Sequence, residues 1–318
     1  MKVLVTGGAG FIGSNIVDRL IEQSFEVVII DNLSTGREEN LNPKAKFYKM
    51  DIISDEVKEV FATEKPDYVI HHGAQIDVQK SLTNPLFDAQ VNILGTINIL
   101  ENCKLYGVRK IVYASSAAVY GDPDYLGVDE KHQVNPLSFY GISKHTPEHY
   151  LKAYSHLYGL KYTILRYANV YGIRQDPKGE GGVVSIFVDK LLSNELPIIF
   201  GDGEQTRDFI YVSDIADANI LALSKGDNDI LNISCNQQTS INDLLSLMNN
   251  LANKNLHPVY KEERSGDIKH SYLDNSKAIE ILNWKPKYTL STGLKETLNY
   301  YRKLFNEQDV KVQVGSHS

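Results

Sequence analysis

The chain has 318 residues, of which 42% are hydrophobic and 23% are charged, and its formal net charge at pH 7 is −7. A chain of this size can bury a core without disulfides or a structural metal. Its dispersed acidic charge attracts neither nucleic acid nor an anionic membrane surface, so we expect neither as a partner. Cys103 and Cys235 lie in apolar stretches and are expected to be reduced thiols of a cytoplasmic protein. We find no export signal and no apolar run of the roughly 20 residues that a membrane span needs.

Strands and helices are predicted to alternate along the first half of the chain. Lys2 to Thr6 has the pattern of a short buried strand, and the glycine cluster that follows opens an amphipathic helix through Ile21. Further strands are predicted at 26–30, 47–50, 68–71, 110–114 and 162–166, and further helices at 57–62, 87–105 and 140–157. This alternation indicates a parallel sheet that is covered by helices on both faces.

The regular alternation of strands and helices ends after residue 167, where loops rich in glycine and proline begin. We therefore predict an α/β protein with a Rossmann-type doubly wound parallel sheet in residues 1–167 and a smaller C-terminal α/β substrate-binding domain in residues 168–306. Residues 208–225 carry a strand and helix pattern that could rejoin the first sheet. Residues 307–318 lack apolar periodicity and are predicted to form a disordered tail.

The glycine cluster predicts a dinucleotide site. Gly7, Gly10 and Gly13 follow a strand and open a helix, so the backbone can approach a pyrophosphate at the helix N-terminus. Asp31 ends the second strand 18 residues after Gly13, where a carboxylate accepts the ribose hydroxyls and repels a 2′-phosphate. This favours NAD over NADP. Asp51 ends the third strand, and two interpretations are equally open: contact with the adenine amino group, or a helix N-cap.

A candidate catalytic group comes from the predicted helix after residue 139. Tyr140 and Lys144 are four residues apart, so the phenol and the ammonium lie on one helix face. A nearby ammonium favours the phenolate and makes tyrosine a usable proton acceptor. Ser116 follows a strand at the carboxyl end of the sheet, where open α/β folds bind ligands. A Tyr-x-x-x-Lys pattern by itself is typical of a solvated helix face, but together with Ser116 and the cofactor loop it indicates catalysis.

These motifs resemble the extended short-chain dehydrogenase/reductases that act on nucleotide sugars, and most closely the UDP-hexose 4-epimerases. The similarity extends over roughly residues 1–305 and rests on these segments: Thr6 to Gly13, Asp31-Asn32, Asp51-Ile52, Ser115 to Gly121, Tyr140 to Lys144, Arg166 to Gly172 and Arg207 to Phe209. The resemblance implies that Tyr140 is the catalytic base, that Lys144 lowers its pKa and holds the nicotinamide ribose, and that Ser116 assists at the sugar hydroxyl. It also implies a homodimer formed through two long helices.

The resemblance further implies the binding residues. The cofactor-binding set is Gly7, Gly10, Phe11, Ile12, Gly13, Asp31, Asn32, Asp51, Ile52, Tyr140 and Lys144. The substrate-binding set is Ser116, Tyr140, Asn169, Arg207, Arg264, Asp267 and Ser271. In this second set the two arginines and Asn169 are expected at the diphosphate, where guanidinium groups suit anionic oxygens, and Asp267 at a ribose. Taken alone, Arg264 and Asp267 would be interpreted as a surface ion pair.

The type of reaction is indicated by two alanines. Related dehydratases and decarboxylases carry an acidic residue where this chain has Ala117 or Ala118, so we expect oxidation and reduction of a single carbon and no elimination. The predicted function is UDP-hexose 4-epimerase, in which hydride leaves carbon 4 for NAD and returns to the other face. A UDP-uronate 4-epimerase, a nucleotide-sugar 4-reductase and a non-catalytic NAD-binding sensor stay open as alternatives.

Ser271 predicts the breadth of the substrate range. By the resemblance, it matches a position beside carbon 2 of the sugar. That position is filled by tyrosine in epimerases limited to plain hexoses and by small residues in those that accept an N-acetyl group. Serine leaves space there, so we expect turnover of UDP-glucose and UDP-galactose and also of UDP-GlcNAc and UDP-GalNAc.

Residues 145–149 match the His-x-x-Glu-His pattern of some zinc peptidases. Pro147 lies inside the turn that would carry the ligands, and a metal-binding helix does not ordinarily have a proline there. We therefore predict no catalytic metal. Pro147 also removes the helical donor to the carbonyl of Ser143, which predicts a bend in this helix.

Overall fold

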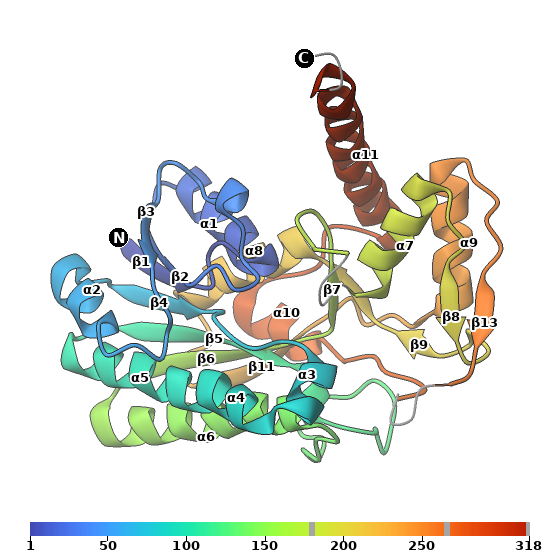
Figure 1. The fold of residues 1–318 in the computed structure, drawn as a ribbon. Helices are drawn as coiled ribbons and strands as arrows, with labels where there is room; N and C mark the ends of the chain where they lie inside the picture. Colours follow the sequence, from blue (N-terminus) through green and yellow to red (C-terminus); the bar gives the residue numbers. More distant parts are fainter. Residues whose placement is uncertain (178–181, 264–267, 316–318) are drawn as a thin grey trace.

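The computed structural model describes residues 1–177, 182–263 and 268–315, and it has a seven-stranded sheet at its centre (Figure 1). Every neighbouring pair of strands in this sheet is parallel, in the order β11-β6-β5-β4-β1-β2-β3. The strands are β1 (Lys2–Thr6), β2 (Glu26–Asp31), β3 (Lys46–Lys49), β4 (Tyr68–His71), β5 (Lys110–Ser116), β6 (Lys161–Tyr167) and β11 (Asp229–Ile233). The predicted parallel α/β fold is confirmed.

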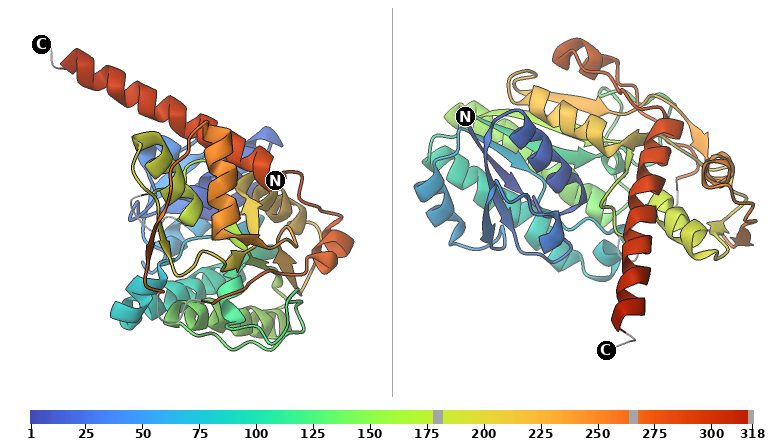
Figure 2. Two further views of the ribbon diagram at one scale, coloured as in Figure 1. Left: turned by 90° about the vertical axis from the view of Figure 1, so that its right-hand side faces the viewer. Right: turned by 90° about the horizontal axis from the view of Figure 1, so that it is seen from above.

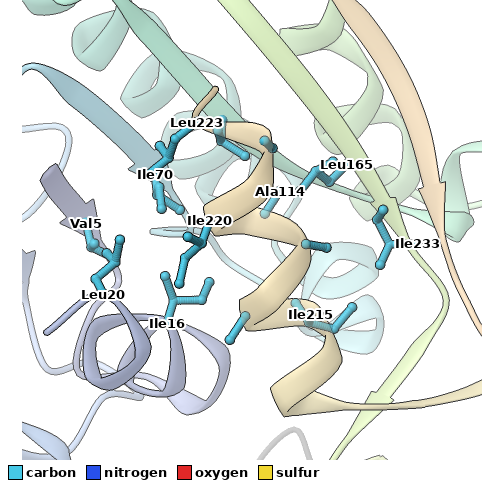
Figure 3. Close-up of a cluster of buried hydrophobic side chains, with 14 of the residues drawn as sticks. Val5, Ile16, Leu20, Ile70, Ala114, Leu165, Ile215, Ile220, Leu223 and Ile233 are labelled. Carbon is cyan, nitrogen blue, oxygen red and sulfur yellow. The ribbon is translucent and has the colours of Figure 1, made fainter. Parts of the chain in front are cut away.

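Helices cover both faces of the sheet, because alternate strand residues point to opposite sides. Val3 and Val5 of β1 belong to one core with α1 (Phe11–Glu22) and α8 (Val212–Ala222). Leu4, between them, belongs to a second core with α2 (Val57–Glu64), α5 (Gly95–Leu105) and α6 (Phe139–Tyr158). Figure 3 shows the first core, in which α8 lies across the sheet with Ile215 and Ile220 among the buried side chains.

The segment before β5 forms a broken helix instead of the single one predicted for residues 87–105. α3 (Val78–Thr83) is followed by α4 (Pro85–Ala89), a π-helical turn, η2 (Gln90–Leu94), and then α5. The side chain of Asn84 caps α4, and Pro85 starts it, which is the favoured place for proline in a helix. The π-helical turn widens the helix beside the carboxyl end of the sheet, and such turns are frequent at functional sites.

The C-terminal part is built from short two-stranded sheets. They pair β7 (Asn169–Tyr171) with β10 (Phe209–Tyr211), β9 (Thr206–Arg207) with β12 (Thr239–Ser240), and β8 (Ile198–Phe200) with β13 (Val259–Lys261). The helices α7 (Val183–Ser193), α9 (Ile241–Ala252) and α11 (Leu290–Gly315) share a third core, and α10 (Ser276–Leu282) packs near β11. None of the helices in the described ranges has the length and hydropathy for a membrane crossing.

Two features differ from the predicted organisation. Within residues 208–225, α8 does pack on the first sheet, but the strand that joins the sheet is β11, which lies beyond that range. The second is that α11 continues to Gly315 and projects away from the body (Figures 1 and 2), while the disorder expected for residues 307–318 stays a prediction. Extending a helix that has already formed adds one backbone hydrogen bond per residue and needs no apolar periodicity. The division at residue 167 stays a prediction.

Candidate active site

One cavity lies at the carboxyl ends of β1, β2, β4 and β5 and reaches to the first turns of α6. We call it the cofactor pocket. Every residue predicted to bind the cofactor lines it: Gly7, Gly10, Phe11, Ile12, Gly13, Asp31, Asn32, Asp51, Ile52, Tyr140 and Lys144. The pocket therefore brings together residues from the glycine turn, from two strand ends and from α6, as expected for a site at the carboxyl edge of a parallel sheet.

The glycine turn is tight because its backbone folds onto itself. Gly7 has a φ of +70°, and the amide of Gly10 donates to the carbonyl oxygen of Gly7 at 3.1 Å. A Cβ atom on Gly13 would lie 2.1 Å from that same oxygen, so only glycine fits where α1 starts. None of the described side chains caps α1, whose first residues line the pocket. Its N-terminal amides are thus placed to receive an anion.

The carboxylate of Asp31 is fixed by the backbone at the end of β2. Its oxygens accept from the amide of Ala9 at 3.0 Å and from the amide of Leu33 at 2.8 Å. Burial raises the pKa of Asp31, and these two hydrogen bonds oppose that rise. Asp51 accepts from the side-chain amide of Asn32 at 2.8 Å. The alternative interpretation of Asp51 as a helix N-cap is wrong, because α2 begins six residues later at Val57.

Tyr140 and Lys144 lie on the first turns of α6. Ser138 caps the helix by accepting from the amide of Gly141 at 3.1 Å, which starts the helix at Phe139 and points both side chains toward the cofactor pocket. Lys144 is buried, and its Nζ lies 5.1 Å from the centre of the Tyr113 ring. Burial lowers the pKa of Lys144 to about 8, although the charges of Asp88 and Glu148 oppose this shift.

Asn92 joins the π-helical turn to α6. Its side-chain amide donates to the hydroxyl of Ser143 and to the carbonyl of Gln75, both at 2.9 Å. Its oxygen accepts from the amide of Gln75 at 2.8 Å. Gln75 lines the cofactor pocket, so this buried cluster connects the pocket wall to the helix turn that carries Lys144. The sequence pattern did not indicate this role for Gln75, because its partner lies 17 residues away on an irregular turn.

His72 and Tyr167 form a second part of the pocket wall, and the sequence pattern did not indicate their contact with each other. Both line the cofactor pocket, their rings stack with centres 5.7 Å apart, and the Tyr167 hydroxyl is 3.1 Å from His72 Nε2. Burial lowers the pKa of His72 to about 3, so this imidazole is neutral at physiological pH. The pair arises because His72 directly follows β4 and Tyr167 ends β6, and these two parallel strands end at the same edge of the sheet.

Ser116 ends β5 but does not line the cofactor pocket. Its hydroxyl accepts from the amide of Ala118 at 3.2 Å and caps the short 3₁₀ turn η3 (Ala117–Val119). Its neighbour Ser115 lines the pocket and donates to Glu148 at 2.7 Å. The structure therefore places Ser116 at the predicted carboxyl edge of the sheet, just outside the pocket wall.

The predicted substrate residues Asn169, Arg207 and Ser271 lie on neighbouring short segments. The amide of Asn169 donates to the carbonyl of Asp208 at 2.9 Å, and the amide of Ser271 donates to the carbonyl of Thr206 at 3.2 Å. Arg207 Nη1 donates to the Thr206 carbonyl at 2.8 Å. Arg264 and Asp267 lie outside the described residues.

A buried carboxylate holds these segments together. Asp208 accepts from the amides of Cys235 at 2.9 Å, Asn236 at 3.1 Å and Leu273 at 3.3 Å. Burial raises the pKa of Asp208 to about 6 despite these donors. Because Asp208 follows Arg207 and Leu273 lies two residues after Ser271, one carboxylate fixes the relative position of both.

The model of the NAD dependent epimerase/dehydratase family matches residues 3–234. The chain belongs to this family. A putative UDP-glucose 4-epimerase of Methanocaldococcus jannaschii is 52% identical, over 94% of this chain and 98% of its own length.

Two solved structures are similar along nearly the whole chain. A UDP-glucose 4-epimerase of Thermotoga maritima with UDP-glucose has a TM-score of 0.95 and 46% identity, covering 96% of this chain and 100% of that one. A UDP-N-acetylglucosamine 4-epimerase of Methanobrevibacter ruminantium in complex with UDP-N-acetylmuramic acid has a TM-score of 0.91 and 38% identity, covering 95% and 98%.

The pocket of this family member fits NAD. A Cβ atom at Gly7 or Gly13 would collide with the backbone of Gly73 or of Gly7, so glycine is needed at both positions to form the tight turn that lines the pocket. Asp31, held by two amides, presents a carboxylate where a ribose diol is expected and a 2′-phosphate would be repelled. The predicted cofactor is confirmed as NAD by the family to which the chain belongs.

Glu148 is not available as the base of a zinc peptidase. It is buried, which raises its pKa, but hydrogen bonds with His145, Arg166 and Ser115 outweigh burial and hold its pKa at about 2. The ranges that the structure describes contain no group of three or more His, Cys, Asp or Glu side chains that could hold a metal. The two histidines of the motif lie one turn apart on α6 and are hydrogen-bonded to each other, with their Nε2 atoms 3.0 Å apart.

Proposed function

We propose that the chain is a UDP-hexose 4-epimerase that interconverts UDP-glucose and UDP-galactose and also accepts UDP-GlcNAc and UDP-GalNAc. The observation that carries this proposal is the convergence of Tyr140 and Lys144 with the glycine turn and Asp31 in one pocket. The relatives that are named epimerases support the reaction, and the structural neighbour that is a UDP-N-acetylglucosamine 4-epimerase supports the wider range.

Bound NAD supplies the hydride acceptor for carbon 4 of the sugar and the hydride for its return. Tyr140 takes the proton of the 4-hydroxyl and later gives it back. The ammonium of Lys144, on the same face of α6, favours the phenolate electrostatically. The face of the Tyr113 ring stabilises that ammonium in its buried site, within the range of a cation–π interaction. We infer that Ser116, which ends β5 next to the pocket-lining Ser115, assists at the sugar hydroxyl.

The keto sugar must rotate in the site between the two hydride transfers. The enzyme should therefore bind the nucleotide tightly and the sugar loosely. Asn169 and Arg207 would hold the diphosphate from β7 and β9, and Asp208 fixes their position. We propose that Arg264 also binds the diphosphate and that Asp267 binds a ribose. The turn η3 carries Ala117 and Ala118 and has no carboxyl group for elimination, which limits the reaction to carbon 4.

We further infer a homodimer formed through α5 and α6 in the cytoplasm. These helices pack together on one face of the sheet, and they and the preceding α4 and η2 leave large apolar side chains exposed. Exposed examples are Leu86, Leu94, Leu105, Ile142 and Leu157. An apolar surface of this kind is typical of an interface between subunits. Cys103 and Cys235 are unpaired, which supports the reducing compartment.

The experiment is incubation of the purified protein with each of the four UDP-sugars without added cofactor, followed by chromatographic separation of the epimers. We expect both pairs to equilibrate, because NAD is held throughout the cycle. UDP-glucuronate is included to detect a uronate epimerase. Stoichiometric consumption of added reduced cofactor would indicate a 4-reductase, and unchanged sugars in NAD-saturated protein would indicate a non-catalytic NAD-binding sensor.

A further inference from the structure

A series of buried polar side chains connects α6 to the substrate side of the molecule. It starts at Glu148 of α6 and continues through Arg166 of β6 and Tyr120, which follows η3, to Asn232 of β11. At most 2% of each of these four residues is exposed. None of the four lines the cofactor pocket, and none has a part in the mechanism proposed above. Buried polar contacts of this kind fix the elements that carry them relative to one another.

The first two members of the series form a buried ion pair. Arg166 donates to Glu148 from Nε at 2.9 Å and from Nη2 at 2.5 Å, and this two-point contact fixes the orientation of the guanidinium plane. The Cζ atom of Arg166 lies 4.8 Å from the centre of the Tyr120 ring, within the range of a cation–π interaction. Tyr120 therefore packs against a cation whose position is set by α6.

The hydroxyl of Tyr120 connects this pair to Asn232. It donates to Oδ1 of Asn232 at 2.7 Å. From Nδ2, Asn232 donates to the carbonyl oxygens of Val128 at 2.9 Å and Asp274 at 3.3 Å. Because the Tyr120 hydroxyl engages the oxygen of the carboxamide, the nitrogen stays directed at these two carbonyls.

Val128 and Asp274 in turn hold the segment that carries Ser271. The amide of Val128 donates to the carbonyl of Tyr272 at 3.1 Å, and the amide of Asp274 donates to the carbonyl of Val128 at 2.9 Å. Tyr272 directly follows Ser271 in the chain. The position of Ser271 relative to α6 therefore depends on the side chains between them, and the Tyr120 hydroxyl is a link that the loss of one oxygen atom removes.

We propose that Tyr120 is a positioning residue of the epimerase, which sets the place of the Ser271 segment relative to Tyr140 on α6. This inference rests on the proposed function, because Ser271 lies beside a sugar only if the chain binds UDP-hexoses. Tyr120 acts through Asn232 and does not itself contact the sugar or the cofactor. Its hydroxyl thus contributes to the binding of substrate and not to the transfer of hydride.

Tyr120→Phe separates these two contributions. The ring remains on Arg166, but Asn232 loses the donor to its oxygen, so the Ser271 segment has more freedom before substrate binds. Substrate binding must then order this segment, and KM for the UDP-sugar rises. Tyr140 keeps its place beside the cofactor, so kcat should change little.

Steady-state kinetics of the NAD-loaded protein with UDP-glucose and with UDP-GlcNAc test the proposal, and the NAD content and Tm are measured beside them. For Tyr120→Phe we expect KM for both sugars to rise about three- to tenfold, the equivalent of one hydrogen bond. The NAD content should be that of the wild type, which also shows that the variant is folded. The matched control is Tyr301→Phe, which removes the hydroxyl of another buried tyrosine, on α11, that donates to the carbonyl of Gln175. It should lower Tm without raising KM.

A second variant tests whether the hydroxyl acts through Asn232. Asn232→Ala removes the acceptor of Tyr120 and both donors to the carbonyls, so KM should rise at least as much as in Tyr120→Phe. Combining the two substitutions should add no further rise, because both break the same link. Either single variant by itself is sufficient for the comparison of KM with the wild type.

Three results would overturn the proposal. These are an unchanged KM in Tyr120→Phe or in Asn232→Ala, an equal rise of KM in Tyr301→Phe, and a rise in the double variant that equals the product of the two single rises. Failure of the proposed function would show differently, because NAD-saturated wild-type protein would then leave both UDP-sugars unchanged in the same assay.

Discussion

The cofactor side and the substrate side of the molecule are positioned by different means. On the cofactor side, one continuous parallel sheet places the glycine turn, Asp31 and His72 at the ends of neighbouring strands. On the substrate side, the described residues form only two- and three-residue strand pairs, and the carboxylate of Asp208 joins their segments. In the sheet, many backbone hydrogen bonds between strands fix the positions of the site residues. On the substrate side, a few hydrogen bonds to Asp208 do so. We therefore expect substitutions on the two sides to have different signatures.

The largest effect is expected from Tyr140→Phe, which removes the proposed proton acceptor and leaves the cofactor pocket in place. Epimerisation should fall by about 10²–10⁴-fold, the usual contribution of a positioned general base. The amide of Tyr140 still donates to Ser81, so the start of α6 is preserved. Turnover of UDP-glucose and the NAD content of the purified protein are measured together. Near-normal turnover would show that Tyr140 is not the base.

Gly13→Ala is expected to damage the cofactor side itself. The added Cβ would lie 2.1 Å from the carbonyl oxygen of Gly7, so the turn must open. We expect loss of bound NAD and a lower Tm, with activity restored only in part by added NAD. Gly10→Ala is the graded comparison, because its Cβ would lie 3.2 Å from the same oxygen, and its Tm should fall less. Full retention of NAD by Gly13→Ala would contradict the role of this turn.

Ser271→Tyr addresses the substrate side. The residue lies on the segment that the Thr206 carbonyl holds, and a bulky ring there is expected to close the space beside carbon 2 of the sugar. Turnover of the N-acetylated pair should fall by about tenfold or more, while the plain hexoses are retained, since steric rejection is more effective than a missing contact. Ser271→Ala, which keeps the space, should leave both pairs unchanged. If Ser271→Tyr turned over the N-acetylated sugars as fast as the wild type, residue 271 would not control access of the N-acetyl group.

Asp208→Asn tests whether the carboxylate of Asp208 holds the substrate-side segments together, and its effect is read from the pH dependence of the free energy of unfolding. Burial raises the pKa of Asp208 to about 6, above the value of about 3.9 in an unfolded chain. Between these values the folded chain holds the proton and the unfolded chain does not. This group therefore lowers the free energy of unfolding as the pH rises from about 4 to about 6, and its contribution is constant above that. The asparagine variant should lose this dependence.

At neutral pH the same variant should also be less stable by about 1–3 kcal/mol, because one backbone donor loses its acceptor. We expect a higher KM for UDP-glucose and little change in NAD content. Urea unfolding of wild type and variant at several pH values, with steady-state kinetics, measures both effects. An unchanged KM would mean that Asp208 does not position the substrate segments.

The contrast also explains what could be predicted from the sequence. Gly13, Asp31, Tyr140 and Lys144 were found because local spacing places them at a strand end or on one helix face, and the parallel sheet then brings them together. The role of Asp208 could not be found in this way. Its partners Cys235 and Leu273 are 27 and 65 residues away, and their approach depends on how short strands pair across the C-terminal part.

Helix boundaries show the same limit. The break between α4 and α5 is a π-helical turn in which Asn92 contacts Gln75 and Ser143, and tertiary hydrogen bonds of this kind leave no mark in apolar periodicity. The same tertiary contacts make Gln75 part of the pocket wall. The continuation of α11 was missed for the opposite reason, because no packing pattern was needed to extend it.

The smallest effect is expected from Tyr113→Phe, on the cofactor side. The hydroxyl of Tyr113 donates to the carbonyl of Lys144 at 3.1 Å, and its loss should cost about 1 kcal/mol of stability. The ring face under the ammonium is retained, so the pH dependence of turnover should not move. In wild type, turnover should fall above about pH 8, where Lys144 loses its proton and no longer favours the phenolate.

Tyr113→Leu separates the ring from the hydroxyl. Without the aromatic face, the buried ammonium loses a stabilising contact worth up to about 2 kcal/mol, so the pKa of Lys144 should fall further. The alkaline limb of the kcat profile is then expected at lower pH in Tyr113→Leu and at the wild-type position in Tyr113→Phe. If both variants shift the alkaline limb equally, the hydroxyl of Tyr113, and not its ring, controls the protonation of Lys144. The cofactor side would then also depend on a single hydrogen bond.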